Sequence, residues 1–351
     1  MSGATEDRCA RVLGPRGCWA GVALGGAASG GLAVAAALAG WRWGTGVGIG
    51  CAAALVFALG LPVGASLVCA THALTGGRWG RELRAAGPAA RSAWLLIPLA
   101  APAVLAGPAP YPWVAAEATG YFDTTWVALR AAVFLGLWVL VGQVLTRSPR
   151  AEAWAGPGVV ILLVSLTGAG YDWVLSLPPE FGSTAFGLDL FVSAALTGFA
   201  ALVGLALLQG ESDPALRRDW GTLLLALVAL HAYVGYFQWL IVLSGDLPRP
   251  GGWYRLRLAD PWGTLAALYV GLGLALPLLL LPFRALTQHP RALGAVCALV
   301  LLGRALECAW WILPAGGGSA LARGVSGALC ILGSCGAWLA VLGWTWRRRA
   351  Q

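Results

Sequence analysis

Residues 185–209 read AFGLDLFVSAALTGFAALVGLALLQ, an apolar stretch in which Asp189 is the only charged side chain. An α-helix needs about 20 apolar residues to cross the hydrocarbon core of a bilayer, because each residue adds about 1.5 Å. The whole chain shares this character: its 351 residues are 59% hydrophobic and 11% charged, with a mean hydropathy of +0.76. A soluble domain carries about 25% charged residues. The sequence therefore predicts an all-α integral membrane protein.

About ten stretches of this kind are expected to span the membrane. Together with short loops they account for the length of the chain, so we expect a single transmembrane domain over residues 1–351. The first stretch is too long for the core of a signal peptide and is expected to be retained. Residues 92–107 form the weakest stretch, because it is short and contains Pro98 and Pro102. The expected spans are residues 17–40, 46–75, 92–107, 125–146, 157–177, 185–209, 221–245, 263–285, 291–313 and 321–346.

The positions of the arginines predict how these spans are oriented. The net charge of +8 comes from arginine alone, since the chain has no lysine. Sixteen arginines fall in the termini and connections on one side and five on the other, while Arg130 and Arg304 lie within spans. Basic residues concentrate in cytoplasmic loops. We therefore expect an even number of spans with both termini in the cytoplasm, in a bacterial inner membrane, and no binding of nucleic acid.

The cysteines and histidines lack the spacing of metal or haem sites. None of the eight cysteines forms a CxxC or CxxCH motif, and the three histidines lie on separate segments. Most of the thiols fall inside apolar stretches, where cysteine behaves as a small hydrophobic residue. We expect no metal site and no covalently bound cofactor in this chain.

A short motif that occurs twice in the sequence predicts how the spans are grouped. Residues 170–175 read GYDWVL and residues 306–314 read LECAWWILP, so an acidic residue precedes tryptophan near the end of each span. The two spans lie four apart and run in the same expected direction, as in folds built from parallel repeats. We expect two parallel four-helix bundles, over residues 46–177 and 185–313, with 17–40 and 321–346 as peripheral helices.

Ionisable side chains inside the expected spans are the first candidates for function, since each costs about 2.5–3.5 kcal/mol to insert at mid-span. Arg304 and Glu307 are three residues apart, on one helix face, where they can neutralise each other. Arg130 is expected to pair with Asp172 or with Glu307. These groups either bind a quinol hydroxyl and pass protons, or only lock helices together; the sequence leaves both interpretations open.

A second set of candidates centres on His231, near the middle of its span. Gln238 follows on the same helix face, and Tyr236 flanks that stripe. Imidazole and carboxylate groups titrate near the working pH when partly buried, as proton transfer requires. An ordinary hydrogen bond between helices is the other interpretation for His231 and Gln238. Asp189 is expected close to the outer interface and is assigned no role.

Several motifs resemble one family of bacterial respiratory proteins. Residues 172–187, DWVLSLPPEFGSTAFG, are similar to the family signature DW-(M/L)-SL-x-P-x-W-x-ST-x-(F/Y)-G. Weaker matches keep the family's order within residues 70–315: RWGRELR at 78–84, YPW at 111–113, GYF at 120–122 before Arg130, YFQWLI at 236–241 and GRALE at 303–307. On these motifs the chain resembles the second large membrane subunit of alternative complex III. That complex is a quinol:cytochrome c oxidoreductase, and the subunit belongs to the polysulfide-reductase (NrfD-like) superfamily.

The resemblance implies ten helices around an inner pair of four-helix bundles. It also implies assembly with a multihaem cytochrome, an iron–sulfur protein and a second NrfD-like membrane subunit. Quinol chemistry would involve Asp172, Arg304 and Glu307, where glutamate replaces the family's usual aspartate. Residues 242–250, VLSGDLPRP, depart from the family pattern WY-x-N-(I/L)-PEE, and Asp246 replaces its asparagine. Asp246 is therefore a further candidate, in a divergent member of the family.

These observations predict a membrane subunit of a respiratory quinol:electron-acceptor oxidoreductase complex. The chain would supply a quinone-site environment, a proton route or both, as a non-catalytic or quinone-binding subunit, while cofactors of its partners carry the electrons. A secondary transporter is an alternative, because such proteins also combine parallel repeats with polar residues in mid-membrane. A purely structural membrane subunit of the same complex is the other alternative.

Overall fold

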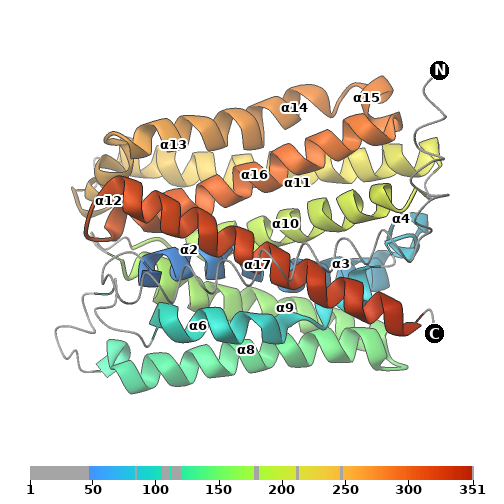
Figure 1. Ribbon diagram of the computed structural model, residues 1–351, viewed down its shortest axis with the longest axis horizontal. Coiled ribbons are helices and arrows are strands. Elements are labelled where there is room, and N and C mark those ends of the chain that lie inside the picture. The colour runs from blue at the N-terminus through green and yellow to red at the C-terminus, as the bar shows by residue number, and fades with distance from the viewer. Residues whose placement is uncertain are drawn as a thin grey trace.

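The computed structural model describes residues 47–83, 85–104, 111, 120–177, 182–210, 213–245 and 248–349. Within these ranges every regular element is a helix and none is a strand (Figure 1). Eight helical segments are long and apolar enough to cross a membrane. They are Gly48–Thr75, Thr124–Arg147, Ala151–Leu175, Phe186–Leu208, Pro214–Ser244, Trp262–Leu280, Pro290–Ala315 and Ala320–Thr345. The expected all-α, multi-pass character is confirmed for the described chain, by length and composition.

Each of these eight helical segments overlaps one expected span, with ends that differ by up to seven residues, as for Pro214–Ser244 against the expected 221–245. The remaining two expected spans have no counterpart among the eight. Residues 17–40 lie outside the described ranges. The stretch 92–107 begins as the short helix η1 (Ala93–Leu96) and continues as α6 (Ile97–Val104), and the residues that follow Val104 are not described.

Breaks within the long segments follow from proline and from local widening of the helix. Pro62 has no N–H to donate, and the turn at Gly60 separates α2 (Val47–Leu59) from α3 (Pro62–Thr75). Two π-helical turns interrupt other spans, η3 (Tyr171–Leu175) and η4 (Tyr269–Ala275). The further elements are α4 (Arg78–Arg81), α5 (Ala86–Ala90), η2 (Gly120–Phe122), α8 (Thr124–Arg147), α9 (Ala151–Gly170), α10 (Phe186–Leu208), α11 (Pro214–Ser244), α12 (Pro248–Leu258), α13 (Trp262–Leu268), α14 (Leu276–Leu280), α15 (Arg284–Gln288), α16 (Pro290–Ile312), η5 (Leu313–Ala315) and α17 (Ala320–Arg349).

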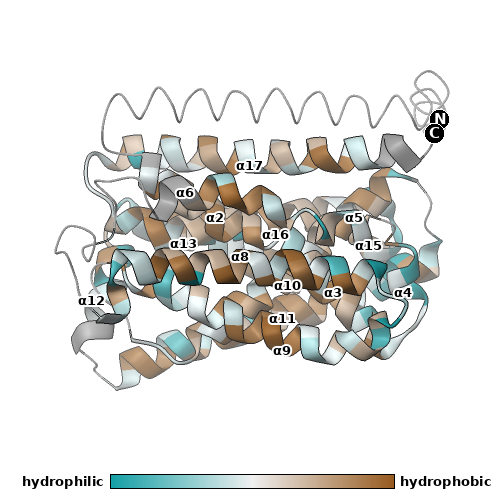
Figure 2. Ribbon diagram, turned by 90° about the horizontal axis from the view of Figure 1, so that it is seen from below, coloured by the Kyte–Doolittle hydropathy of each residue, from teal (hydrophilic) through white to brown (hydrophobic). Residues whose placement is uncertain are grey.

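The long helices lie side by side with their axes roughly aligned, so that the molecule has an α4 end and an α12 end (Figure 1). The middle of the helices is mostly apolar, and the strongest hydrophilic colour gathers around α4 (Figure 2). α10 is the central helix: it packs against α3 and α9 on one side and against α11 and α16 on the other. α17 lies at the periphery and packs mainly on α2.

The contact between α3 and α10 depends on two glycines that face each other. A Cβ atom on Gly64 would collide with the carbonyl oxygen of Ala194 and with the backbone of Gly198, and a Cβ on Gly198 would collide with Gly64. Small residues let membrane helices approach this closely. The close packing of α3 on α10 therefore requires glycine at both positions.

We expect Gly64→Ala to lower the free energy of unfolding by about 1–3 kcal/mol, because the added methyl group forces α3 and α10 apart. Gly235→Ala on α11 is the matched control, since a Cβ there meets no atom within 4 Å. Thermal unfolding of the two detergent-solubilised variants measures the difference. Equal stability of both variants would show that the close approach at Gly64 carries no packing energy.

Candidate functional site

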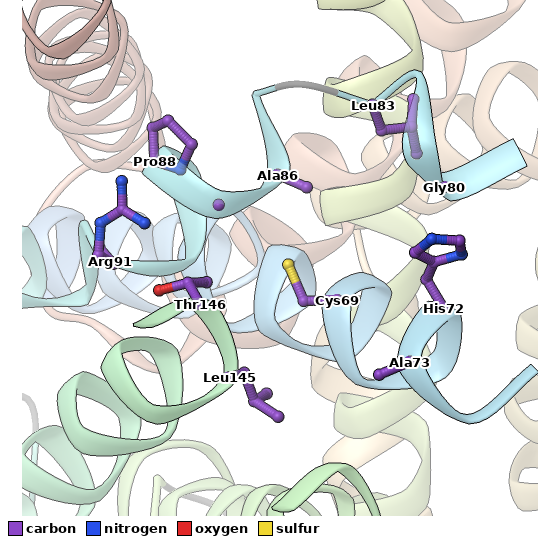
Figure 3. A pocket seen from close by; sticks show the side chains of 11 residues that line it. Cys69, His72, Ala73, Gly80, Leu83, Ala86, Pro88, Arg91, Leu145 and Thr146 are labelled. Carbon is purple, nitrogen blue, oxygen red and sulfur yellow. The ribbon is translucent and has the colours of Figure 1, made fainter. Parts of the chain in front are cut away.

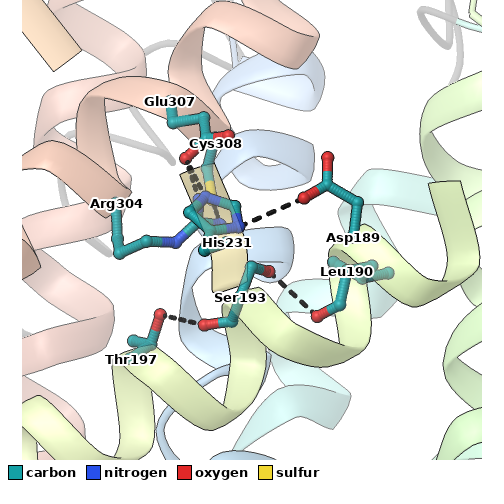
Figure 4. Close-up of polar contacts among 8 residues, drawn as sticks. All are labelled: Asp189, Leu190, Ser193, Thr197, His231, Arg304, Glu307 and Cys308. Carbon is teal, nitrogen blue, oxygen red and sulfur yellow. Dashed lines mark hydrogen bonds and ion pairs between the residues drawn. The ribbon is translucent and has the colours of Figure 1, made fainter. Parts of the chain in front are cut away.

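Four buried ionisable side chains from three helices meet near the α12 end of the bundle (Figure 4). Asp189 comes from the first turn of α10, and His231 from the middle of α11. Arg304 and Glu307 both come from α16, close to its end at Ile312. All four are at most 5% exposed. We call these four residues the His231 cluster.

His231 is held between the two carboxylates through its two ring nitrogens. Nδ1 lies 3.1 Å from Oδ1 of Asp189, and Nε2 lies 2.9 Å from Oε2 of Glu307. Neither Nδ1 of His231 nor Oδ1 of Asp189 makes a hydrogen bond in the described part of the chain, so their 3.1 Å approach is an ion-pair contact without hydrogen-bond geometry.

Arg304 is the permanent cation of the cluster. Its Nη1 donates to Oε2 of Glu307, as the three-residue spacing predicted, and also lies 2.8 Å from Nε2 of His231. Its Nη2 lies 3.7 Å from Sγ of Cys308. The guanidinium also faces the ring of Trp311, 5.2 Å from its centroid. Arg304 thus binds the glutamate and the imidazole at the same time.

The charges of the cluster leave room for one exchangeable proton. Two carboxylates and one guanidinium leave a charge of −1 if the imidazole is neutral, and a lone uncompensated charge is costly in a buried site. One proton, on the imidazole or on a carboxyl group, brings the cluster to neutrality. The hydrogen bonds also allow the state without it, because Nη1 of Arg304 can donate to both Nε2 of His231 and Oε2 of Glu307. The cluster can therefore hold and hand over a single proton.

Asp189 is the cluster member that the sequence analysis did not select. It was expected at the water-accessible interface, but it is 2% exposed, because the first turn of α10 packs against α16. Ser193 and Thr197 follow it at four-residue intervals and are equally buried. This i, i+4, i+8 spacing of polar residues in an apolar helix was the available signal. Each hydroxyl donates to a carbonyl of α10 itself, so the stripe adds no continuous hydrogen-bonded chain.

Arg130 and Asp172 form the second predicted pair. Nε and Nη2 of Arg130 donate to the two carboxylate oxygens of Asp172 at 2.8 and 3.1 Å. Asp172 lies in η3 and is fully buried, whereas 22% of the Arg130 side chain is exposed. The ring of Tyr121 covers the guanidinium, 3.9 Å from its centroid. Both charges are compensated in this pair, which makes it a lock between α8 and η3.

The other sequence candidates lie apart from the His231 cluster. Gln238 is buried on the same face of α11 as His231, but its Oε1 accepts a hydrogen bond from Ser183 at 3.0 Å. Tyr236 is 53% exposed and contacts Phe237 and Trp239 on the outer surface of α11. Asp246 lies outside the described residues. The structure thus joins His231, Arg304 and Glu307, adds Asp189, and leaves Tyr236 on the surface.

Two arginines counted as loop charges in the sequence are structural caps at the end of α16. Nε and Nη2 of Arg257, which is fully buried, donate to the carbonyl oxygen of Trp311 at 3.0 and 2.6 Å. Nη1 of Arg323 donates to the carbonyl oxygens of Leu313, Pro314 and Gly316. Burial lowers the pKa of Arg257 to about 9, which still leaves the guanidinium charged at neutral pH. These bonds satisfy carbonyls that a helix end leaves without partners.

A cavity of about 380 Å³ opens at the opposite, α4 end of the bundle (Figure 3). His72 in the last turn of α3, Thr146 in the last turn of α8 and Arg91 at the end of α5 contribute its polar lining. No acidic side chain lines it in the described structure. Its distance along the helices separates it from the His231 cluster, to which the first turn of α10 contributes Asp189.

No group of three histidine, cysteine or acidic residues in the described ranges is arranged to hold a metal ion. Comparison of the sequence with protein-family models and with curated proteins finds no match. The arguments for function therefore depend on the chemistry of the His231 cluster and on the series of sequence motifs described above.

Proposed function

We propose that this protein is a membrane subunit of a respiratory quinol oxidoreductase complex of the alternative complex III type. In this proposal the His231–Glu307 contact accepts or releases a proton during quinone chemistry. The single observation that carries the proposal is the buried 2.9 Å contact between the two side chains, in a cluster whose charges balance only when one proton is added.

Quinol oxidation releases protons together with electrons, and the two must leave by different routes. A buried imidazole held between two carboxylates can take up a proton, because a carboxylate oxygen lies beside each ring nitrogen and compensates the charge of the imidazolium. Electron transfer needs cofactors that this chain is expected to lack. The proposal therefore includes partners: a multihaem cytochrome, an iron–sulfur protein and a second NrfD-like membrane subunit.

The proposal also includes a topology of ten spans in two parallel four-helix bundles, with peripheral first and last helices. Its support is the similar placement of two buried acids, Asp172 next to Trp173 and Glu307 before Trp310. Each of these tryptophans makes an edge-to-face contact with another tryptophan, at 89° in both cases. The arginine bias supports a cytoplasmic position for the α4 end and for both termini, in a bacterial inner membrane.

A purely structural role in the same complex is the second candidate function, and one specific observation favours it. The Arg130–Asp172 pair is fully compensated and joins two helices, as a lock without chemistry would. The His231 cluster differs, because its charges balance only when a proton is added. Activity measurements on the cluster therefore separate the two functions.

Replacing Glu307 with glutamine removes the titratable carboxyl group and keeps its shape. We expect Glu307→Gln to lower quinol oxidation by the purified complex about 100-fold, in line with the loss of a general acid–base group, while the subunits still co-purify. Glu152→Gln, at an exposed position of α9, is the matched control and should leave turnover unchanged. Full turnover of Glu307→Gln would contradict the proton role, and isolation of the chain as a stable homo-oligomer without cytochrome would contradict the complex.

A further inference from the structure

Two cysteines that are 279 positions apart in the sequence have their sulfur atoms in contact. Sγ of Cys51 in α2 lies 3.8 Å from Sγ of Cys330 in α17. Both side chains are buried, with 4% and 7% exposure. From the sequence, these thiols were expected only to fill space among apolar residues. Their contact adds a chemical possibility that a lone thiol does not have, because two adjacent thiols can be oxidised to a disulfide.

The backbones of α2 and α17 approach each other closely next to this pair. A Cβ atom on Gly50 would lie 2.9 Å from the carbonyl carbon of Ser326. Cys51 follows Gly50 directly, and Cys330 lies one helical turn after Ser326. A disulfide needs Cα atoms within about 4.4–6.8 Å, and a close approach of two helix backbones provides that spacing. The neighbouring glycine thus makes the pair compatible with a covalent bond.

α17 is the helix whose attachment such a bond would change most. It lies at the edge of the bundle and packs mainly on α2. Its other polar contacts with the bundle include the caps made by Arg323 and a hydrogen bond from Nε1 of Trp338 to Oγ of Ser92 at 3.1 Å. A disulfide between Cys51 and Cys330 would fasten this last helix to the core.

We propose that Cys51 and Cys330 form a redox-active dithiol that a lipid-soluble quinone oxidises to a disulfide, which fixes α17 to α2. The pair lies within apolar spans, away from both aqueous phases, which favours an oxidant that dissolves in the bilayer. A quinone does so and accepts two electrons together with two protons. The proposal is independent of the role assigned to the His231 cluster.

The reaction is balanced without any further reactant. Two S–H bonds break and one S–S bond forms, and the two thiols together lose two protons and two electrons. The quinone takes up both and becomes one quinol, with both carbonyl oxygens converted to hydroxyl groups. A dithiol reductant reverses the reaction by thiol–disulfide exchange.

The test incubates the reduced full-length protein in lipid nanodiscs with a short-chain benzoquinone whose ring is fully substituted. We expect two of the eight thiols to disappear and one quinol to form per chain. Peptide mapping should find Cys51 linked to Cys330, and dithiothreitol should restore both thiols. On a non-reducing gel the oxidised chain should migrate faster, since the bond closes a loop over most of its length.

Variants at the two positions and at a neighbouring cysteine sharpen this test. Cys51→Ala and Cys330→Ala should each lose no thiol and form no quinol, whereas Cys335→Ala on the same helix should still lose two. Peptide mapping of the unmodified protein decides the question even if a variant fails to fold. The proposal is overturned if all eight thiols survive the quinone, if other cysteines react instead, or if only copper-phenanthroline links the pair.

Discussion

Arg304→Met should lower the free energy of unfolding of the detergent-solubilised protein by about 3–5 kcal/mol, the cost of breaking a buried ion pair on one side. The change removes the only permanent cation of the His231 cluster. Two carboxylates then remain at a site that is at most 5% exposed. A single imidazolium can balance only one of them. Chemical or thermal unfolding, followed by tryptophan fluorescence, measures the loss.

The double variant Arg304→Met/Glu307→Met should recover most of this stability. It removes one charge of each sign, and Asp189 and a protonated His231 then balance each other at 3.1 Å. Replacing a buried ion pair by apolar groups of similar volume is often neutral or stabilising. A double variant as unstable as the single one would show that packing of the Arg304 side chain, and not charge balance, holds the cluster together.

Arg130→Met should be the second most damaging change, with a loss of about 3 kcal/mol, because a buried carboxylate loses both of its charged hydrogen bonds. Asp172 is fully buried, so water cannot replace them. The same unfolding measurement applies.

The chain offers a matched control for Arg130 in an exposed ion pair of the same type. Arg78 and Asp213 lie 3.3 Å apart, and their side chains are 59% and 54% exposed. Arg78→Met should cost less than about 1 kcal/mol, as exposed pairs contribute little. If both variants lose the same stability, burial does not determine the strength of the Arg130 pair. A further variant, Arg130→Met/Asp172→Leu, should regain stability if charge imbalance is the cause.

The spans were predictable because the length of an apolar stretch is a local property of the sequence. The two ion pairs were also predictable, since a charged group within a span needs a partner and few candidates exist. Asp189 was missed for a different reason. Its place near the end of a span suggested contact with water, but the surroundings of a side chain depend on which helix packs over it. That information is not contained in α10 alone.

The face of a helix is likewise determined by its neighbours. Gln238 shares the buried face of α11 with His231, as the spacing predicted, while Tyr236 falls on the exposed face. The arginine count treated Arg257 and Arg323 as loop charges, because the sequence cannot show that their partners are backbone carbonyls at the end of α16 and in the residues that follow it. The contact between Cys51 and Cys330 joins the two ends of the described chain. No local pattern could have indicated it.

The caps on α16 have a consequence for how the sequence can vary. Within the described part of the chain, each acceptor of Arg257 and Arg323 is a main-chain oxygen, at Trp311, Trp253, Leu313, Pro314 and Gly316. A carbonyl oxygen is present whatever the side chain, so mutational drift at these acceptor positions leaves the bonds available. The two donors have no such freedom, because only arginine offers several N–H groups in a planar fork. Retention of these hydrogen bonds thus depends on the arginine codons at positions 257 and 323, while the codons of the acceptor residues can change.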